Sequence, residues 1–154
     1  MSIANANLLP SQQAAVVGVI DPDALAANTY TTGWISMADF LAIQAIVMAG
    51  TLGSSATVDA KLEQATDGSG TGVKDVTGKA ITQLTQAGTD DSDKQAIINC
   101  RSEELDIDND FTHVRLSLTV AAATSDVGAV VMGHYPSYGP ASESDASTVA
   151  EIVE

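Results

Sequence analysis

Two histidines and one cysteine are the side chains in this sequence best suited to catalysis. His113 lies on the polar side of an alternating segment, Cys100 lies on the apolar side of another, and His134 precedes Tyr135-Pro136. A Ser-His-Asp arrangement stays open because serine and aspartate are plentiful, but no G-x-S-x-G nucleophile elbow occurs. A cysteine on the apolar side of a strand is usually inert packing. We therefore predict that the protein is not an enzyme, and we name no catalytic residue.

Two acidic clusters resemble parts of calcium-binding loops. Asp106, Asp108 and Asp110 alternate as in such a loop, but Phe111 replaces the required glycine and Ser117 stands where the final glutamate belongs. The second cluster consists of Asp90, Asp91 and Asp93. A calcium site of another type stays open, but solvated turns are the expected structure. A single cysteine also excludes a cysteine-based zinc site and an intramolecular disulfide. We predict no metal site and no cofactor.

The segment from Gly72 to Lys79 has some features of a phosphate-binding loop. Five residues separate its two glycines where the motif requires four, and Ala80 stands where a magnesium-binding serine or threonine is needed. The segment also leads into a predicted strand instead of a helix. It is therefore interpreted as a surface hairpin.

If the chain is a jelly-roll sandwich, as the strand pattern described below predicts, carbohydrate binding is the main alternative to a purely structural role, because such sandwiches often bind sugars. Such sites usually present exposed aromatic rings, and the candidates here are Trp34, Tyr30, Tyr135 and Tyr138. Trp34 is equally well explained as an anchor in the core or between subunits.

Composition narrows the class of protein further. The chain has 154 residues, enough for one domain with a real core, and its 45% apolar content is typical of a folded protein. It has 20 acidic and 6 basic residues, a net charge of −14, and its cations are scattered between Lys61 and Arg115. Nucleic-acid binding and binding to an anionic membrane are therefore not expected. The N-terminal sequence has no basic start and no long apolar run, so we predict no signal peptide.

The elements that would position these side chains are predicted to be short strands. Period-2 alternation is clear at residues 58–63, 95–101 and 113–120, which indicates strands with one buried face. Residues 13–20, 78–85 and 127–133 are further strand candidates, the first ended by the turn cluster Asp21-Pro22-Asp23. Ser36-Met37-Ala38-Asp39 has the form of a capping box, so residues 36–40 are predicted to form a short helical turn before a strand at 40–49. Turn signals fall between these runs, and the pattern predicts an all-β, two-sheet sandwich of jelly-roll type.

Several motifs spread over much of the chain together resemble a known family. The resemblance covers residues 33–140 and is carried by S-M-x-x-F before the first apolar strand, GTLGSSATVDAKL, the turn QATDGSG and the strand HVRLSLTV. These segments are similar to small structural proteins of tailed phages, prophages and gene transfer agents. The resemblance implies a head decoration protein or the base of a head spike or fibre, with a tail or adaptor component of the same particle as an alternative. It carries no catalytic motif.

The composition along the chain predicts its organisation, and the resemblance implies its partners. We expect an N-terminal arm at residues 1–12, a sandwich domain at 13–133 and an acidic C-terminal tail at 134–154, which is either disordered or a docking arm. The expected partners are other copies of the chain, as a trimer or pentamer, and a major capsid protein or head fibre protein. The arms and the loops at residues 68–72 and 89–93 are the expected contact regions. The expected location is the virion, assembled from protein made in the host cytoplasm.

Overall fold

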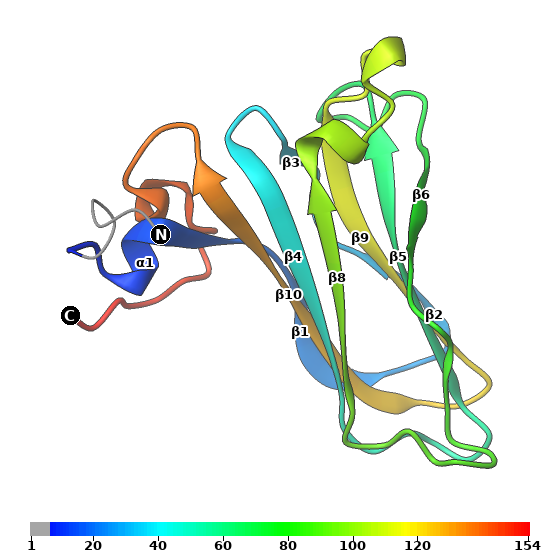
Figure 1. The fold of residues 1–154 in the computed structure, drawn as a ribbon. Helices are drawn as coiled ribbons and strands as arrows, with labels where there is room; N and C mark the ends of the chain where they lie inside the picture. The colour runs from blue at the N-terminus through cyan, green and yellow to red at the C-terminus, as the bar shows by residue number, and fades with distance from the viewer. Residues whose placement is uncertain (1–6) are drawn as a thin grey trace.

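The computed structural model of the chain describes residues 7–154 and contains ten strands within them (Figure 1). The strands are β1 (Ala14–Leu25), β2 (Asn28–Thr31), β3 (Ile35–Ser36), β4 (Phe40–Ala49), β5 (Thr57–Ala65), β6 (Lys74–Ala80), β7 (Leu84–Thr85), β8 (Gln95–Arg101), β9 (His113–Ala121) and β10 (Ser125–Pro136). The helical segments are α1 (Pro10–Gln13) and the 3₁₀ turns η2 (Ser102–Glu104), η3 (Ile107–Asn109) and η4 (Ala141–Ser144). No helix in the described part of the chain is long and apolar enough to cross a membrane.

The strands pair as one long hairpin rolled into a sandwich. The outermost pair is β1 with β10, followed inward along the chain by β2 with β9, β4 with β8 and β5 with β6, all antiparallel. Successive pairs alternate between two sheets, which gives the strand orders β1-β10-β4-β8 and β2-β9-β5-β6, with β3 and β7 added to the second sheet. Eight strands nested in this way form a jelly roll. The predicted all-β jelly-roll sandwich is therefore confirmed.

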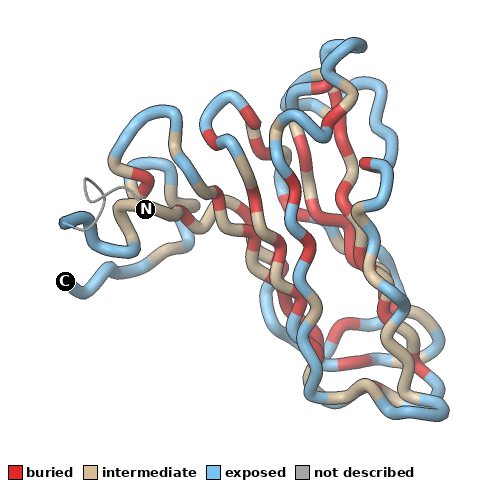
Figure 2. Tube along the Cα trace, viewed as in Figure 1, coloured by how far each residue is buried: buried red, intermediate tan, exposed pale blue. Residues whose placement is uncertain are grey.

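The core lies between the two sheets, where the buried residues of both gather (Figure 2). Its largest fully buried side chains include Ile43 from β4, Leu62 from β5, and Leu116 and Leu118 from β9. The clear sequence alternation of β5 and β9 follows from this packing, because every second side chain enters the core and the others face outward. Aliphatic side chains dominate the core because the chain is only 4% aromatic.

Several predicted strands are confirmed, and two local predictions are wrong. The segments at 58–63, 95–101 and 113–120 are β5, β8 and β9. The Asp21-Pro22-Asp23 cluster does not end the first strand, because β1 continues through it to Leu25 with a register shift between Ile20 and Asp23. A proline is tolerated there because β1 is an edge strand and the irregularity removes the need for its missing N–H group. The candidate strand at 78–85 is divided between the end of β6 and β7.

Residues 36–40 form a β-turn where a helical turn was predicted. The Asp39 amide donates to the Ser36 carbonyl oxygen at 3.3 Å, and the Ala38 amide donates to Ser36 Oγ at 3.3 Å. The serine thus caps a single turn between β3 and β4, and the chain then becomes extended at Phe40. The apolar run that follows keeps the chain in the sheet because its side chains are buried alternately.

The two terminal segments pack beside the end of the first sheet where β10 finishes (Figure 1). β10 continues beyond the expected domain end at Gly133 to Pro136. The Val16 amide donates to Asp145 Oδ1 at 2.7 Å, and the Ala146 amide donates to the Val16 carbonyl oxygen at 2.7 Å. A small second cluster of Ala15, Phe40 and Ala141 lies at the same place. The beginning of the tail is therefore attached to β1, and the first six residues of the expected N-terminal arm lie outside the described part.

Candidate functional site

The outer face of the β2-β9-β5-β6 sheet is polar and held by ion pairs. Lys61 Nζ lies 2.6 Å from Asp75 Oδ1 and 3.6 Å from Glu63 Oε1. The hydrogen bond to Asp75 raises the pKa of Lys61. Arg115 contacts Glu63 Oε2 through both Nε, at 2.8 Å, and Nη2, at 2.7 Å. This face has the character of a solvated surface.

The aromatic side chains that were candidates for the alternative sugar-binding function do not form one platform. Trp34 covers the Arg115 guanidinium, whose central carbon lies 4.6 Å from the ring centroid. Gly70 lies so close to this ring that a Cβ atom on it would be 2.8 Å from Trp34 Nε1. Tyr135 and Tyr138 are exposed at and beyond the end of β10, on the other sheet. The Trp34 ring therefore already packs against Arg115 and Gly70.

The outer face of the β1-β10-β4-β8 sheet differs sharply from this polar surface. Three rows of outward side chains cross this sheet, two of them over all four strands and the third over β10, β4 and β8. None of these side chains is charged. The central row is Val19, Val130, Ile46 and Ile97; the flanking rows are Val16, Met132, Gln44 and Asn99 on one side, and Gly128, Met48 and Gln95 on the other. We call these three rows the neutral face. Ile97 and Met48 are the most exposed apolar side chains on it, at 56% and 54%.

Charged residues border the neutral face at its ends and along the irregular part of β1, where Asp21 is exposed. Asp23 and Asp126 lie at the end where β10 begins, and Arg101 lies at the other end of β8. The Arg101 side chain is itself paired with Glu103 at 3.3 Å. The face thus combines an apolar centre with polar and charged margins, which is the arrangement of a protein–protein contact.

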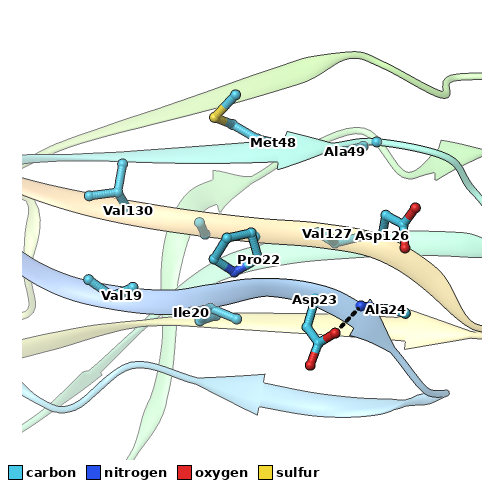
Figure 3. Close-up of a pocket in the computed structure, with 13 residues that line it drawn as sticks. Val19, Ile20, Pro22, Asp23, Ala24, Met48, Ala49, Asp126, Val127 and Val130 are labelled. Carbon is cyan, nitrogen blue, oxygen red and sulfur yellow. Dashed lines mark hydrogen bonds between the residues drawn. The ribbon is translucent and has the colours of Figure 1, made fainter. Parts of the chain in front are cut away.

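A groove of about 790 Å³ lies on the neutral face over β10 (Figure 3). Its walls include Val19, Pro22, Met48 and Val130, which come from β1, β4 and β10. Gly128 forms the floor of the groove. Pro22 packs directly against it, because β1 is irregular between Ile20 and Asp23. The lining is mostly apolar, with Asp23 and Asp126 at one end, and it holds no histidine or cysteine, so it offers contact area in place of reactive groups.

The structure keeps the candidate catalytic residues apart. His113 Nδ1 lies 2.8 Å from Thr112 Oγ1, and His134 neighbours the Tyr135 ring at 6.3 Å. Cys100 points into the core at 1% exposure, and its burial raises the pKa of the thiol to about 11. No described hydrogen bond joins either histidine to a carboxylate. Nothing in the described residues assembles a nucleophile, a base and an orienting acid.

Carboxylates of both acidic clusters already have partners within the protein. Asp106 contacts Lys74 and accepts from Asn109 Nδ2 at 2.9 Å, and the hydrogen bond from Lys74 lowers the pKa of Asp106. Asp91 accepts from the Thr85 amide at 3.0 Å, which is the main reason that its pKa is lowered. Among residues 7–154, no three side chains of histidine, cysteine, aspartate or glutamate gather in a form that could hold a metal ion.

The candidate phosphate loop and the candidate contact loops are ordinary turns of the sandwich. Residues 74–80 form β6, which pairs with β5, so the hairpin interpretation of Gly72 to Lys79 is confirmed. Asp67 organises the loop at 68–72 by accepting from the Ser69 and Thr71 amides at 2.9 and 3.1 Å. At the other end of the sandwich, Asp90 accepts from Ser92 Oγ at 2.7 Å within the loop at 89–93.

The neutral face was not predicted from the sequence, although two features of the sequence point to it. Ile97 interrupts the polar side of β8, where the neighbouring outward positions are Gln95 and Asn99. β4 is apolar at nearly every position, and β10 is uncharged and mostly apolar over residues 127–133, which is typical of a strand covered on both faces. Only the register of the strands reveals that these residues meet in one row.

The fold defines the class of protein as a jelly-roll sandwich, and the comparisons with known proteins add limited detail. The sequence matches no family model and no curated protein. Among solved structures it is similar to a chain of infectious bursal disease virus, Gt strain, with 12% identity, a TM-score of 0.43 and coverage of 84% of this chain and 33% of that one. It is also similar to a chain of the Cowpea Mosaic Virus empty virus-like particle, with 16% identity, a TM-score of 0.37 and coverage of 70% and 55%. The chain thus spans about a third of the length of the first and about half of the second. The jelly-roll assignment rests on the strand order described above.

Proposed function

We propose that this chain is a structural virion protein that works through protein–protein contacts. The observation that carries the proposal is the neutral face: a chain with a net charge of −14 keeps the middle of one sheet face free of charge. An uncharged apolar surface on a strongly acidic protein is unfavourable in water and becomes favourable when a partner covers it. The jelly roll supports the proposal because many viral capsid domains have this architecture, although a fold alone does not determine function.

The particle that we propose is a tailed phage or phage-like particle. In it, the chain is a capsid accessory of the decoration or head-spike base type, which contacts other copies of itself and a capsid or head fibre protein. A tail or adaptor component of the same particle is the alternative within this proposal. The role requires no catalysis, which agrees with the separation of His113, His134 and Cys100 in the fold.

Purified particles provide the direct test. Particles from a host that carries the gene are purified by density gradient, their proteins are quantified by mass spectrometry, and the particle is imaged by cryo-electron microscopy. We expect the chain in many copies per particle and a jelly-roll density on the head. A chain that is abundant in the lysate but absent from intact particles would contradict the proposal, and a density on the tail would favour the alternative.

A further inference from the structure

We propose that a second copy of this chain covers the neutral face, packed sheet to sheet about a two-fold axis. The axis crosses the strands at the central row of Val19, Val130, Ile46 and Ile97. The inference rests on the proposed function in one respect, since it takes the neutral face to be a protein–protein contact. It goes further by naming the partner, the symmetry and the orientation.

Charge favours a second copy on this face over any other approach of two copies. Two bodies that each carry −14 repel one another wherever their acidic surfaces meet. The opposite sheet presents Lys61, Glu63, Asp75 and Arg115 on its outer face, already paired among themselves. The neutral face brings the two chains together through side chains without charge and keeps the acidic loops at the margins.

The register of the strands makes the face complementary to itself. A two-fold axis at the central row places residues at equal distances before and after that row opposite one another. On β8, Asn99 of one copy then faces Gln95 of the second copy, and both are amides that donate and accept hydrogen bonds. On β10, Met132 faces Gly128 of the second copy, where the groove beside Pro22 lies. A methionine side chain is unbranched and adapts well to an irregular groove.

An axis across the strands also keeps the terminal segments apart. These segments lie beside the end of the sheet where β10 finishes (Figure 1). The rotation exchanges the ends of the two sheets, so each copy's terminal segments lie beyond the opposite end of its partner. The same exchange places the Arg101 end of one β8 over the end of the partner's β8 that follows Asp93. An axis along the strands would stack the terminal segments on each other.

The size of the face predicts a reversible contact. Four strands about 4.8 Å apart, each contributing seven residues of about 3.4 Å, cover roughly 19 by 24 Å. Two such faces bury on the order of 900 Å², which is at the low end for specific interfaces. An isologous pair of this kind is separate from the ring contacts of a trimer or pentamer, so both can occur in one particle.

Sedimentation of the full-length chain over a range of concentrations tests the contact. We expect a monomer–dimer equilibrium that strengthens with added salt, because salt screens the repulsion between the acidic bodies. Ile97→Glu should weaken association at least about tenfold, since it places two like charges near the axis. Ile107→Glu is the matched control, because Ile107 is equally exposed, at 59%, but lies on η3 away from the neutral face. Circular dichroism establishes that both variants fold. A wild-type chain that stays monomeric, or equal dimerisation by all three proteins, would overturn the inference.

Cross-linking tests the orientation. The native Cys100 is buried, so single cysteines introduced on the surface react selectively. With sheets about 10 Å apart, Asn99→Cys of one copy lies about 10 Å from Gln95→Cys of the other, whereas two copies of Asn99→Cys lie about 17 Å apart. A bis-maleimide with a reach of about 10 Å should therefore join the mixed pair in preference to either protein alone. Preferential self-linking of Asn99→Cys would overturn the proposed axis.

The outcomes separate this inference from the proposed function. A chain that is present in particles but does not dimerise contradicts the inference and leaves the virion role standing. A chain that dimerises through Ile97 but is absent from particles contradicts the virion role and leaves the inference standing.

Discussion

Pro22 lies directly over Gly128, so closely that a Cβ atom on the glycine would be 2.8 Å from the proline Cα atom. The absence of a side chain at Gly128 lets the irregular part of β1 approach β10 closely, and the two residues form part of the groove on the neutral face. Glycine is required at position 128 because Pro22 leaves no room for a side chain, and not because of an unusual backbone angle. The sheet therefore depends on a missing side chain at one position.

Gly128→Ala should destabilise the fold. The added methyl group forces β1 away from β10, and overpacking of this kind costs about 1–3 kcal/mol of unfolding free energy. Urea denaturation measures the change. Gly33→Ala is the control, because nothing lies within 4 Å of a Cβ atom at Gly33, and a change within about 0.5 kcal/mol is expected. Equal stability of the two variants would show that Pro22 moves away without cost.

Arg115→Met should also destabilise the fold, through the loss of the pair with Glu63. The Glu63 side chain is only 14% exposed and receives two contacts from Arg115. In Arg115→Met its carboxylate therefore loses most of the interactions that offset its removal from water. Loss of one partner from a partly buried pair costs about 1–3 kcal/mol, as measured by urea denaturation. Arg101→Met removes an exposed pair with Glu103 and should change stability by less than about 0.5 kcal/mol. Similar losses in both variants would contradict this ranking.

These residues also show how far the sequence predicts the molecule. The alternation of Val58, Ala60 and Leu62 identifies β5, because one face of that strand meets the core and the other meets water. β4 and the middle of β10 lack such alternation, since both of their faces are apolar, and periodicity alone does not distinguish a buried strand from a short buried helix there. Pro22 resembles a turn residue locally, and only its place on an edge strand makes it compatible with β1.

The candidate site was less predictable than the fold for a related reason. Ile97 is a single exception on one strand, and a single exposed isoleucine requires no explanation. It becomes part of a surface only when register places it beside Ile46 and Val130. Pairing between strands distant in sequence is a tertiary property, which local patterns do not determine.

Stability should fall at alkaline pH because of Cys100. Burial raises the pKa of its thiol from 9.0 to about 11, so the folded state holds the proton where the unfolded state releases it. The stabilisation is complete below about pH 9 and is lost as pH rises from there through about 11. Denaturation measured at several pH values should show this loss in the wild type and a smaller one in Cys100→Ala. Identical pH profiles for the two proteins would contradict the predicted role of the thiol.

Asp145 should determine whether the C-terminal tail stays attached to the sheet. Its carboxylate accepts the Val16 amide at 2.7 Å, and the adjacent Ala146 amide returns a bond to the Val16 carbonyl oxygen at 2.7 Å. Asp145→Ala leaves the Val16 amide without its side-chain acceptor, so this backbone group should exchange hydrogen faster and the tail should be cut more readily by protease. Asp145→Asn is the sharper control, because its side-chain oxygen still accepts a hydrogen bond, and Glu143→Ala tests the loss of an exposed carboxylate nearby. The free energy of unfolding should fall by about 1 kcal/mol, because one hydrogen bond to a charged group is lost at an edge strand. Hydrogen exchange at Val16 that is unchanged in Asp145→Ala would show that the Ala141 and Phe40 contacts hold the tail by themselves.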